Sequence, residues 1–285
     1  MNYTPSQGPQ GPEAYPSLVA RSIVVTGGGQ GIGRCLSLAL AERGANVLIT
    51  AARDLSSLQK TVSMSKNLTG QMIFLQADIR EPEECARTVA LAISEFGSID
   101  CLINNAARGI VYVREATGGR MVPFWESDHD RWAETMITNV IGTYFMSALA
   151  GKEMVENGFG RIINVSTSDR SMIREKNTPY GPSKAALEAM SVALANEAQD
   201  KGVTVNVLLP GGATKTRMLS GVTKFSMCDP FEPEVMNTAA LWLCSDDSKG
   251  YTGGRYIGCE WDPFIEPLAA AVRSRQLPQV LPSIM

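Results

Sequence analysis

The sequence of 285 residues contains a single histidine, His129, and this scarcity excludes several kinds of site. A metal centre built from several histidines is impossible, and the triad of a serine hydrolase would depend on this one residue. His129 lies in the polar run 126–130, which is typical of a surface segment. The commonest hydrolase chemistries are therefore disfavoured, and no metal site is expected.

An excess of positive charge and long apolar runs are also missing. The chain has 26 basic and 29 acidic residues, a formal net charge of −3, so no basic surface is available to hold nucleic acid. No apolar stretch approaches the roughly 18 residues that cross a bilayer, and the N-terminus lacks a signal pattern. None of the six cysteines forms a C-x-x-C pair, which indicates reduced thiols. We expect a cytoplasmic protein without nucleic-acid or membrane partners.

Short β-branched runs alternate with segments of helical periodicity from residue 21 onward. Strands separated by helices, without hairpins, form a parallel sheet that right-handed crossovers cover on both faces. We therefore predict an α/β protein with a single doubly wound, Rossmann-type sheet of about seven strands. The strands are expected at residues 22–26, 47–50, 72–75, 101–104, 161–165, 203–209 and 255–257, and two long helices at 128–157 and 179–199.

No linker divides residues 20–262, so a single domain is predicted there. Residues 1–19 are rich in Pro, Gly, Ser and Gln and have no periodic apolar face, which predicts a flexible N-terminal tail. Residues 263–285 form an apolar C-terminal extension that either covers a pocket, its own or a neighbour's, or packs loosely. The segment 219–230 is expected to form a lid over the substrate.

Five motifs occur in order along residues 21–260. The glycine-rich segment Thr26–Gly33 joins the first strand to the first helix, where glycines let a pyrophosphate approach the N–H groups of a helix N-terminus. The other four are Asn104–Ala107 after the fourth strand, Asn139 in the long helix, Tyr180 with Lys184 in a Y-x-x-x-K pattern, and Pro210–Gly211 after the sixth strand. This set resembles the short-chain dehydrogenase/reductase family.

The resemblance implies that residues 20–262 form an NAD(P)-binding domain. The glycine segment would line the pyrophosphate and ribose, Asp78 would reach the adenine, and Asn105 would pack beside the adenosine ribose. The alternative for Asp78 is a helix cap, and either Thr214 or Thr216 would touch the nicotinamide carboxamide. The cofactor-binding residues so implied are Gly27, Gly29, Gln30, Gly31, Ile32, Gly33, Arg53, Asp78, Ile79, Asn105, Ala106, Ala107, Tyr180, Lys184, Pro210, Gly211, Ala213 and Thr214.

The residues after the second strand bear on the choice of cofactor. An acidic residue 18 positions after Gly33 would bind the ribose 2′-hydroxyl of NAD, but Ala51 occupies this position. No carboxylate is then present to repel a 2′-phosphate, and Arg53, together with Arg34, would pair with it. NADP is therefore favoured over NAD. The alternative for Arg53 is a solvated loop charge.

Tyr180 and Lys184 stand four residues apart, so on a helix they share one face. By the resemblance, Tyr180 transfers a proton, and Lys184 with the nicotinamide cation lowers its pKa from the ordinary ~10. Thr167, 13 positions before the tyrosine, would hold the substrate oxygen, and Ser168 is the alternative. Asn139 would hold a water that links Lys184 to solvent, or would bond locally within its helix.

The resemblance thus implies an NADP(H)-dependent oxidoreductase that moves hydride between nicotinamide and a carbonyl or secondary alcohol, with ketone reduction as the favoured direction. Alternatives are a non-redox isomerase or dehydratase on the same scaffold and a nucleotide-sensing protein without turnover. Arg108, Arg114 and Arg120 would receive an acidic substrate or lie in solvent. Family members are commonly homodimers or homotetramers that associate through the long helices.

Overall fold

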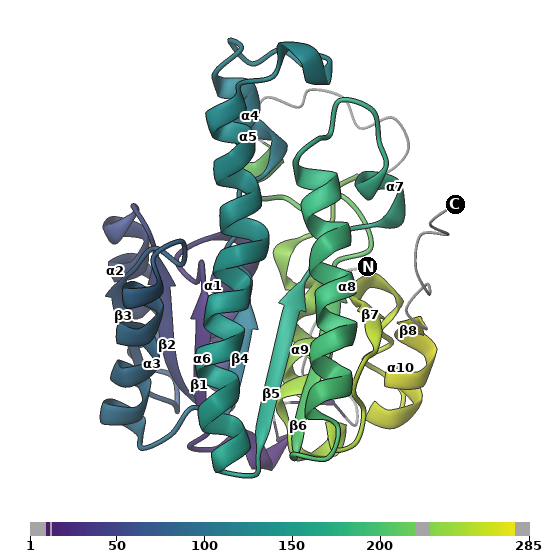
Figure 1. Cartoon of the computed structure of the whole chain (residues 1–285). Coiled ribbons are helices and arrows are strands. Elements are labelled where there is room, and N and C mark those ends of the chain that lie inside the picture. The colour runs from purple at the N-terminus through teal and green to yellow at the C-terminus, as the bar shows by residue number, and fades with distance from the viewer. Residues whose placement is uncertain (1–9, 12, 220–228, 277–285) are drawn as a thin grey trace.

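The computed structural model describes residues 10–11, 13–219 and 229–276, which fold around one sheet of eight strands (Figure 1). The strand order is β3-β2-β1-β4-β5-β6-β7-β8, and every neighbouring pair is parallel except β7 with β8. The predicted doubly wound sheet is confirmed, with one strand more than the expected seven. The strands are β1 (Ser22–Thr26), β2 (Asn46–Ala51), β3 (Met72–Gln76), β4 (Cys101–Asn104), β5 (Gly160–Val165), β6 (Val203–Leu209), β7 (Arg255–Ile257) and β8 (Arg275–Gln276).

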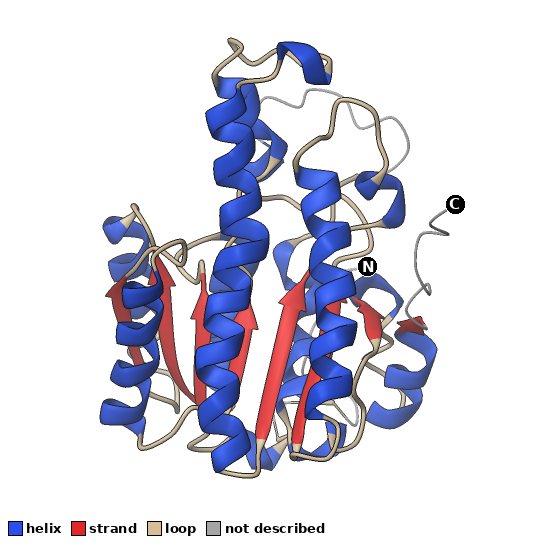
Figure 2. Ribbon diagram, in the orientation of Figure 1, coloured by secondary structure: helices blue, strands red, loops and turns tan. Residues whose placement is uncertain are grey.

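Helices cover both faces of the sheet (Figure 2). On one face, α1 and α9 bury apolar side chains such as Leu36 and Trp242 in one core, and on the other α6 and α8 bury Met146 and Ala195 in a second. Figure 1 shows α3, α6 and α8 side by side on this second face. The α-helices are α1 (Gly31–Glu42), α2 (Leu55–Met64), α3 (Pro82–Phe96), α4 (Ile110–Glu115), α5 (His129–Met136), α6 (Thr143–Glu156), α7 (Asp169–Met172), α8 (Tyr180–Ala198), α9 (Asn237–Cys244) and α10 (Pro267–Ser274).

The long helix predicted over 128–157 is present, but it is not uniform. A π-helical turn, η3 (Ile137–Gly142), joins α5 to α6 without a break in the helix. Such turns insert one extra residue and occur often at functional sites. The remaining short helices are the 3₁₀ segments η1 (Pro16–Leu18), η2 (Phe124–Glu126), η4 (Arg217–Leu219), η5 (Pro233–Met236), η6 (Asp246–Ser248) and η7 (Gly258–Glu260).

The prediction of a flexible N-terminal tail is wrong for the described part of residues 1–19. Leu18 is fully buried, and Tyr15 is only 3% exposed. Gln10 accepts a hydrogen bond from the Trp261 indole at 2.7 Å and donates to the carbonyl oxygen of Ile265 at 2.7 Å. This segment packs against the C-terminal part of the domain because two apolar side chains and one amide find partners there, although they form no periodic face.

The C-terminal extension is folded where it is described. Ala270 and Ala271 of α10 are buried, and β8 pairs with β7 at the edge of the sheet. Phe264 and Leu268 remain exposed, so the extension does not use these side chains to cover a pocket of its own chain. Its last residues, 277–285, and most of the expected lid, 220–228, lie outside the described residues.

Within the described residues no helix is long and apolar enough to cross a membrane. No group of three or more histidine, cysteine, aspartate or glutamate side chains in that part of the chain is placed to hold a metal ion. The five cysteines described there carry free thiols.

Candidate active site

The motif residues meet at the carboxyl ends of four parallel strands, the upper edge of the sheet in Figure 1. Thr26 ends β1, Asn104 ends β4, Val165 ends β5 and Leu209 ends β6. The strand order reverses between β1 and β4, since the chain builds outward from β1 in one direction and from β4 in the other. Doubly wound sheets bind their ligands in the crevice at this reversal.

The glycine-rich turn between β1 and α1 depends on its glycines. Gly27 and Gly31 have φ of 68° and 53°, in the left-handed region that favours glycine. A Cβ atom at Gly33 would lie 2.3 Å from the carbonyl oxygen of Gly27. The helix and the turn therefore touch backbone to backbone, and any side chain at this contact would force them apart.

Residues after β4 hold this turn in place. The Thr26 hydroxyl accepts hydrogen bonds from the backbone N–H groups of Asn105 and Ala106, each at 3.1 Å. The Asn105 amide donates back to the carbonyl oxygens of Thr26 and Gly27 at 3.0 and 3.1 Å. These four bonds join the two strand ends that flank the crevice, and Ala107 follows directly on this connection.

The N-terminus of α1 fits the pyrophosphate of a dinucleotide. The N-cap residue, Gln30, gives the helix no side-chain hydrogen bond, so the N–H groups of Ile32 and Gly33 have neither a capping nor an intrahelical partner. Free N–H groups and the positive end of the helix dipole bind anions. The residues present therefore fit an NAD(P) cofactor, and the role of each single residue toward it stays a prediction.

The two arginines expected near the ribose phosphate differ in their surroundings. Arg34 is engaged: its Nε donates to the Thr61 hydroxyl at 2.9 Å and its Nη2 to the carbonyl oxygen of Gly29 at 2.5 Å. Arg53, two residues after β2 ends at Ala51, is exposed and has no hydrogen bond or ion pair with the described residues. Arg53 is thus available to an anion, whereas Arg34 supports the glycine turn.

Asp78 lies just after β3, as expected, but its carboxylate is already occupied. Arg80 donates to both carboxylate oxygens, with its shortest bond, from Nη2 to Oδ2, at 2.7 Å. Burial opposes ionisation of Asp78, but the hydrogen bonds from Arg80 outweigh it and lower the pKa of the carboxyl group. Glu81 is the N-cap of α3, so the alternative reading of Asp78 as a helix cap is wrong. Ile79 is buried.

Tyr180 begins α8, with the Thr167 side chain as the hydrogen-bond partner of its phenol. Burial raises the pKa of Tyr180 above its ordinary value of 10.0, and the bond with Thr167 offsets only part of this. The lowered pKa expected from Lys184 does not occur in the chain alone. The Ser168 hydroxyl lies 3.0 Å from the Ser171 hydroxyl. The structure therefore brings Thr167, and not the alternative Ser168, to the tyrosine.

Lys184 follows one turn later in α8 and is 3% exposed. Its ammonium donates to the carbonyl oxygen of Val165, the last residue of β5, at 2.7 Å. Burial lowers the pKa of Lys184 from 10.5 to about 8, although the nearby Glu188 carboxylate partly opposes this shift. The charged lysine thus contacts the strand end that leads to Thr167.

Asn139 lies in the π-helical turn, and its side chain bonds outside its own helix. Its Oδ1 accepts from the backbone N–H of Arg108 at 2.8 Å, and its Nδ2 donates to the Arg108 carbonyl oxygen at 3.0 Å and the Ser183 hydroxyl at 2.9 Å. Local bonding, the alternative for this residue, is therefore wrong. Asn139 connects the segment after β4 with α8 beside Lys184, and its part in holding a water stays a prediction.

The turn after β6 begins with Pro210 and contains Gly211, whose φ is 95°. The Thr214 hydroxyl donates to the carbonyl oxygen of Gly212, two residues away. Thr216 instead lies against the glycine turn, since a Cβ at Gly31 would be 3.1 Å from its methyl carbon. Of the two candidate threonines, Thr216 is therefore the one next to the predicted phosphate site.

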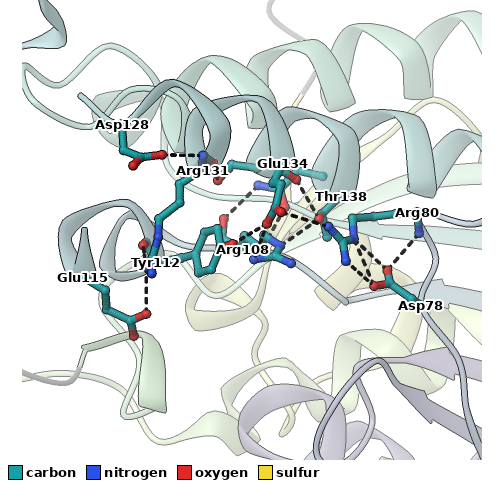
Figure 3. Close-up of polar contacts among 11 residues, drawn as sticks. Asp78, Arg80, Arg108, Tyr112, Glu115, Asp128, Arg131, Glu134 and Thr138 are labelled. Atoms are coloured by element: carbon teal, nitrogen blue, oxygen red, sulfur yellow. Dashed lines mark hydrogen bonds and ion pairs between the residues drawn. The ribbon is translucent and has the colours of Figure 1, made fainter. Parts of the chain in front are cut away.

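An ion-pair network that the sequence does not predict lies beside this site (Figure 3). Glu134 of α5 pairs with Arg108 at 3.0 Å and with Arg80 at 3.5 Å, and it accepts a hydrogen bond from the Tyr112 hydroxyl. The Arg108 guanidinium stacks 3.9 Å from the centre of the Tyr112 ring. The Arg108 side chain is 13% exposed, so it does not lie in solvent, and its contact with a substrate stays a prediction. Through Arg80 the network reaches Asp78, and no spacing in the sequence links these residues.

Comparison with known proteins agrees with this arrangement. A family model described as short chain dehydrogenase matches residues 21–226. Versicolorin reductase 1 of Aspergillus parasiticus is 32% identical over 230 residues, which cover 79% of this chain and 82% of the relative. Glucose 1-dehydrogenase 2 of Bacillus subtilis is 27% identical over 249 residues, with coverages of 84% and 93%.

Solved structures resemble the fold as well. The structure of a short-chain type dehydrogenase/reductase from Mycobacterium ulcerans matches with a TM-score of 0.73 at 26% identity. The match covers 83% of this chain and 87% of that one. The chain therefore belongs to the short-chain dehydrogenase/reductase family of oxidoreductases.

Proposed function

We propose that the protein is an NADP(H)-dependent oxidoreductase that reduces the carbonyl group of a small organic substrate to a secondary alcohol. The observation that carries this proposal is the placement of Tyr180, whose phenol bonds to Thr167 and stands one helical turn before the buried Lys184 ammonium. These three groups lie at the same edge of the sheet as the glycine turn that fits a dinucleotide. Hydride transfer and proton transfer would thus meet in one crevice.

Tyr180 is the proton donor in this mechanism. Its raised pKa keeps the phenol protonated at neutral pH, which is the form that protonates a ketone oxygen as it gains negative charge. The bound nicotinamide would supply the hydride. The Thr167 hydroxyl would donate a second hydrogen bond to the same oxygen and so fix its distance from the phenol.

Lys184 and Asn139 support the proton transfer. The lysine ammonium stabilises the phenolate that remains after Tyr180 gives up its proton, because opposite charges favour the ionised form. Asn139 holds the Ser183 hydroxyl, adjacent to Lys184 in α8, at 2.9 Å. This bond fixes the start of α8 while a proton returns to Tyr180 from solvent.

The preference for NADP rests on Ala51 and Arg53. Ala51 presents no carboxylate to a 2′-phosphate, and the Arg53 guanidinium has no partner among the described residues. Titration of tryptophan fluorescence with NADP and NAD tests this, with Arg53→Ala compared with Arg87→Ala, an exposed arginine of α3. We expect Arg53→Ala alone to weaken NADP binding, by about 10-fold. Tighter binding of NAD than NADP by the unaltered protein would overturn the assignment.

Turnover of small ketones and secondary alcohols tests the reaction itself. NADPH absorbance is followed with each compound for the unaltered protein, for Tyr180→Phe and for Tyr251→Phe, a tyrosine beside Trp242 and outside the site. Only Tyr180→Phe should lose activity, and ketone reduction should be faster than alcohol oxidation at equal saturation. Full activity in Tyr180→Phe would sink the mechanism.

We also propose that the protein is a cytoplasmic homodimer or homotetramer that associates through α6 and α8. Ile141, in the π-helical turn before α6, and Tyr144, at the start of α6, are 43% and 48% exposed. Ala185, Ala189 and Ala193 recur every fourth residue on exposed positions of α8, where small side chains allow a close approach of helices. Light scattering should show an oligomer that Ala189→Arg dissociates. A monomeric unaltered protein at micromolar concentration would contradict this.

A further inference from the structure

Arg255 is a charged residue enclosed at the end of the sheet that the mechanism above does not use. Its side chain is 6% exposed and extends from β7, the strand between β6 and the C-terminal strand β8. Its Nε donates to both Glu188 oxygens at 3.0 and 3.2 Å, and its Nη2 donates to the Thr167 carbonyl oxygen at 3.0 Å and to Asp169 at 2.6 Å. Its Nη1 donates to the Gln276 side chain at 2.5 Å. The guanidinium therefore has a partner on each of its nitrogens.

The segment that Arg255 contacts lies beyond the end of the hydrogen-bond ladder between β5 and β6. The paired register of β5 with β6 ends at Val165, and one further bond joins the Ser166 N–H to the Leu208 carbonyl oxygen at 3.0 Å. Thr167 is thus the first residue of this segment whose backbone no strand holds. The Arg255 bond to its carbonyl oxygen replaces the missing ladder bond.

Charged side chains hold each residue of this short segment. Lys184 bonds to the Val165 carbonyl oxygen at 2.7 Å, the Ser166 hydroxyl donates to Glu188 at 2.5 Å, and Arg255 bonds to Thr167. Two of these side chains come from α8 and one from β7. The Arg255–Glu188 pair therefore connects the helix that carries Tyr180 with the strand end that carries Thr167.

We propose that Arg255, paired with Glu188, is a positioning residue that fixes the Thr167 hydroxyl beside the Tyr180 phenol. The proposal rests on the proposed function, because it concerns the distance between the Thr167 hydroxyl and the Tyr180 phenol, the two groups that would bond to the substrate oxygen. It also gives the C-terminal extension a part in the active site, since Gln276 of β8 completes the set of partners around Arg255.

A purely structural ion pair and a positioning pair respond differently when both charges are removed. Removal of one partner alone leaves a buried charge uncompensated, which destabilises any protein. Arg255→Gln with Glu188→Gln removes the more buried carboxylate as well, and the Asp169 carboxylate, which also loses its partner, is 51% exposed, so stability should recover relative to Arg255→Gln. The bond from Arg255 to the Thr167 backbone is still missing, so the position of the hydroxyl should not recover.

Four variants carry the test: Arg255→Gln, Arg255→Gln with Glu188→Gln, Arg255→Lys, and Arg273→Gln as the matched control. Arg273 lies in the same extension, pairs with Asp262 and is 64% exposed. We expect the double variant to melt near the unaltered protein, to bind NADP equally well, and to lose about 10-fold in kcat, the value of one charge-assisted hydrogen bond. Arg255→Lys, which keeps the charge but has its donors on a single nitrogen, should recover part of kcat, and Arg273→Gln should match the unaltered protein.

Hydrogen exchange gives a second measurement that needs no turnover. The backbone N–H groups of Ser166, Ser171 and Met172, which bond to the carbonyl oxygens of Leu208 and Ser168 on either side of Thr167, should exchange about 10-fold faster in the double variant, while those of α9 stay unchanged. If the unaltered protein turns over no substrate, the proposed function fails, and exchange alone decides the role of Arg255. Unchanged exchange at the N–H groups of Ser166, Ser171 and Met172, or a double variant with the kcat of the unaltered protein, would overturn the proposal.

Discussion

Replacing Lys184 with methionine should stabilise the folded chain at neutral pH while it abolishes turnover. Burial lowers the pKa of Lys184 from 10.5 to about 8, so the folded protein binds a proton here less tightly than the unfolded chain does. Between these two values the unfolded state carries more protons, and the stability of the unaltered protein therefore rises with pH. Methionine has a similar length and no charge, so the variant lacks this dependence.

The size of the effect follows from the shift. Each pKa unit corresponds to 1.36 kcal/mol, so the buried ammonium costs about 3 kcal/mol at pH 7 and about 1 kcal/mol at pH 10. The hydrogen bond to the Val165 carbonyl oxygen offsets part of this cost in the unaltered protein. The stability advantage of the variant over the unaltered protein should therefore shrink by about 2 kcal/mol between pH 7 and pH 10.

Urea unfolding at the two pH values, without added cofactor, measures this difference. Lys201→Met is the matched control, because that side chain is exposed in the turn after α8 and its charge stays in water in both states. The control should shift stability equally at both pH values. Parallel pH dependence of Lys184→Met and the unaltered protein would refute the reasoning, since it would mean that the ammonium is not desolvated by folding.

Three further predictions follow from contacts described above. Gly33→Ala places a Cβ 2.3 Å from the Gly27 carbonyl oxygen, so NADP affinity in a fluorescence titration should fall at least about 10-fold, and unchanged affinity would contradict the close contact. Gln10→Leu leaves the buried Trp261 N–H without its acceptor and should cost about 1 to 3 kcal/mol in urea unfolding, whereas a mobile segment would cost nothing. The hydrogen bond from Tyr112, and to a smaller extent the charges of Arg108 and Arg80, lower the pKa of Glu134 in the folded protein. The ionised carboxylate therefore stabilises the fold above pH 4.5, the pKa in the unfolded chain, and this stabilisation is lost as the pH falls through the folded-state pKa. Glu134→Gln should thus cost about 1 kcal/mol at pH 7 and nothing near pH 2, as measured by thermal melting at both values.

The strands could be predicted because short runs of β-branched or apolar residues mark segments that are buried in a sheet. Residues 22–26, 101–104, 203–209 and 255–257 are expected as strands and are strands with these bounds, since β-branched or apolar runs of this length are buried on both faces of a parallel sheet. The catalytic pair Tyr180 and Lys184 could be placed for a similar reason. Their spacing fixes their relation on one helix, whatever the rest of the chain does.

Contacts between distant segments were not predictable in this way. Gln10 meets Trp261 across 251 positions, and Arg255 meets Thr167 across 88. Neither pair has a spacing that repeats or a composition that differs from its surroundings. The raised pKa of Tyr180 is unpredictable from sequence for another reason: it depends on how deeply the phenol is buried, and spacing along a helix carries no information on depth.

The two-residue strand β8 decides how the sheet ends. Arg275 and Gln276 pair with Tyr256 and Arg255, so the outer edge of β7 finds its partner within the same chain. A strand this short offers few free backbone groups to another chain, which is how many proteins avoid edge-to-edge aggregation. The same two residues therefore terminate the sheet and bring Gln276 to Arg255. A substitution that unpaired β8 from β7 would remove a partner of Arg255 and would also expose the backbone of β7 to pairing with another chain.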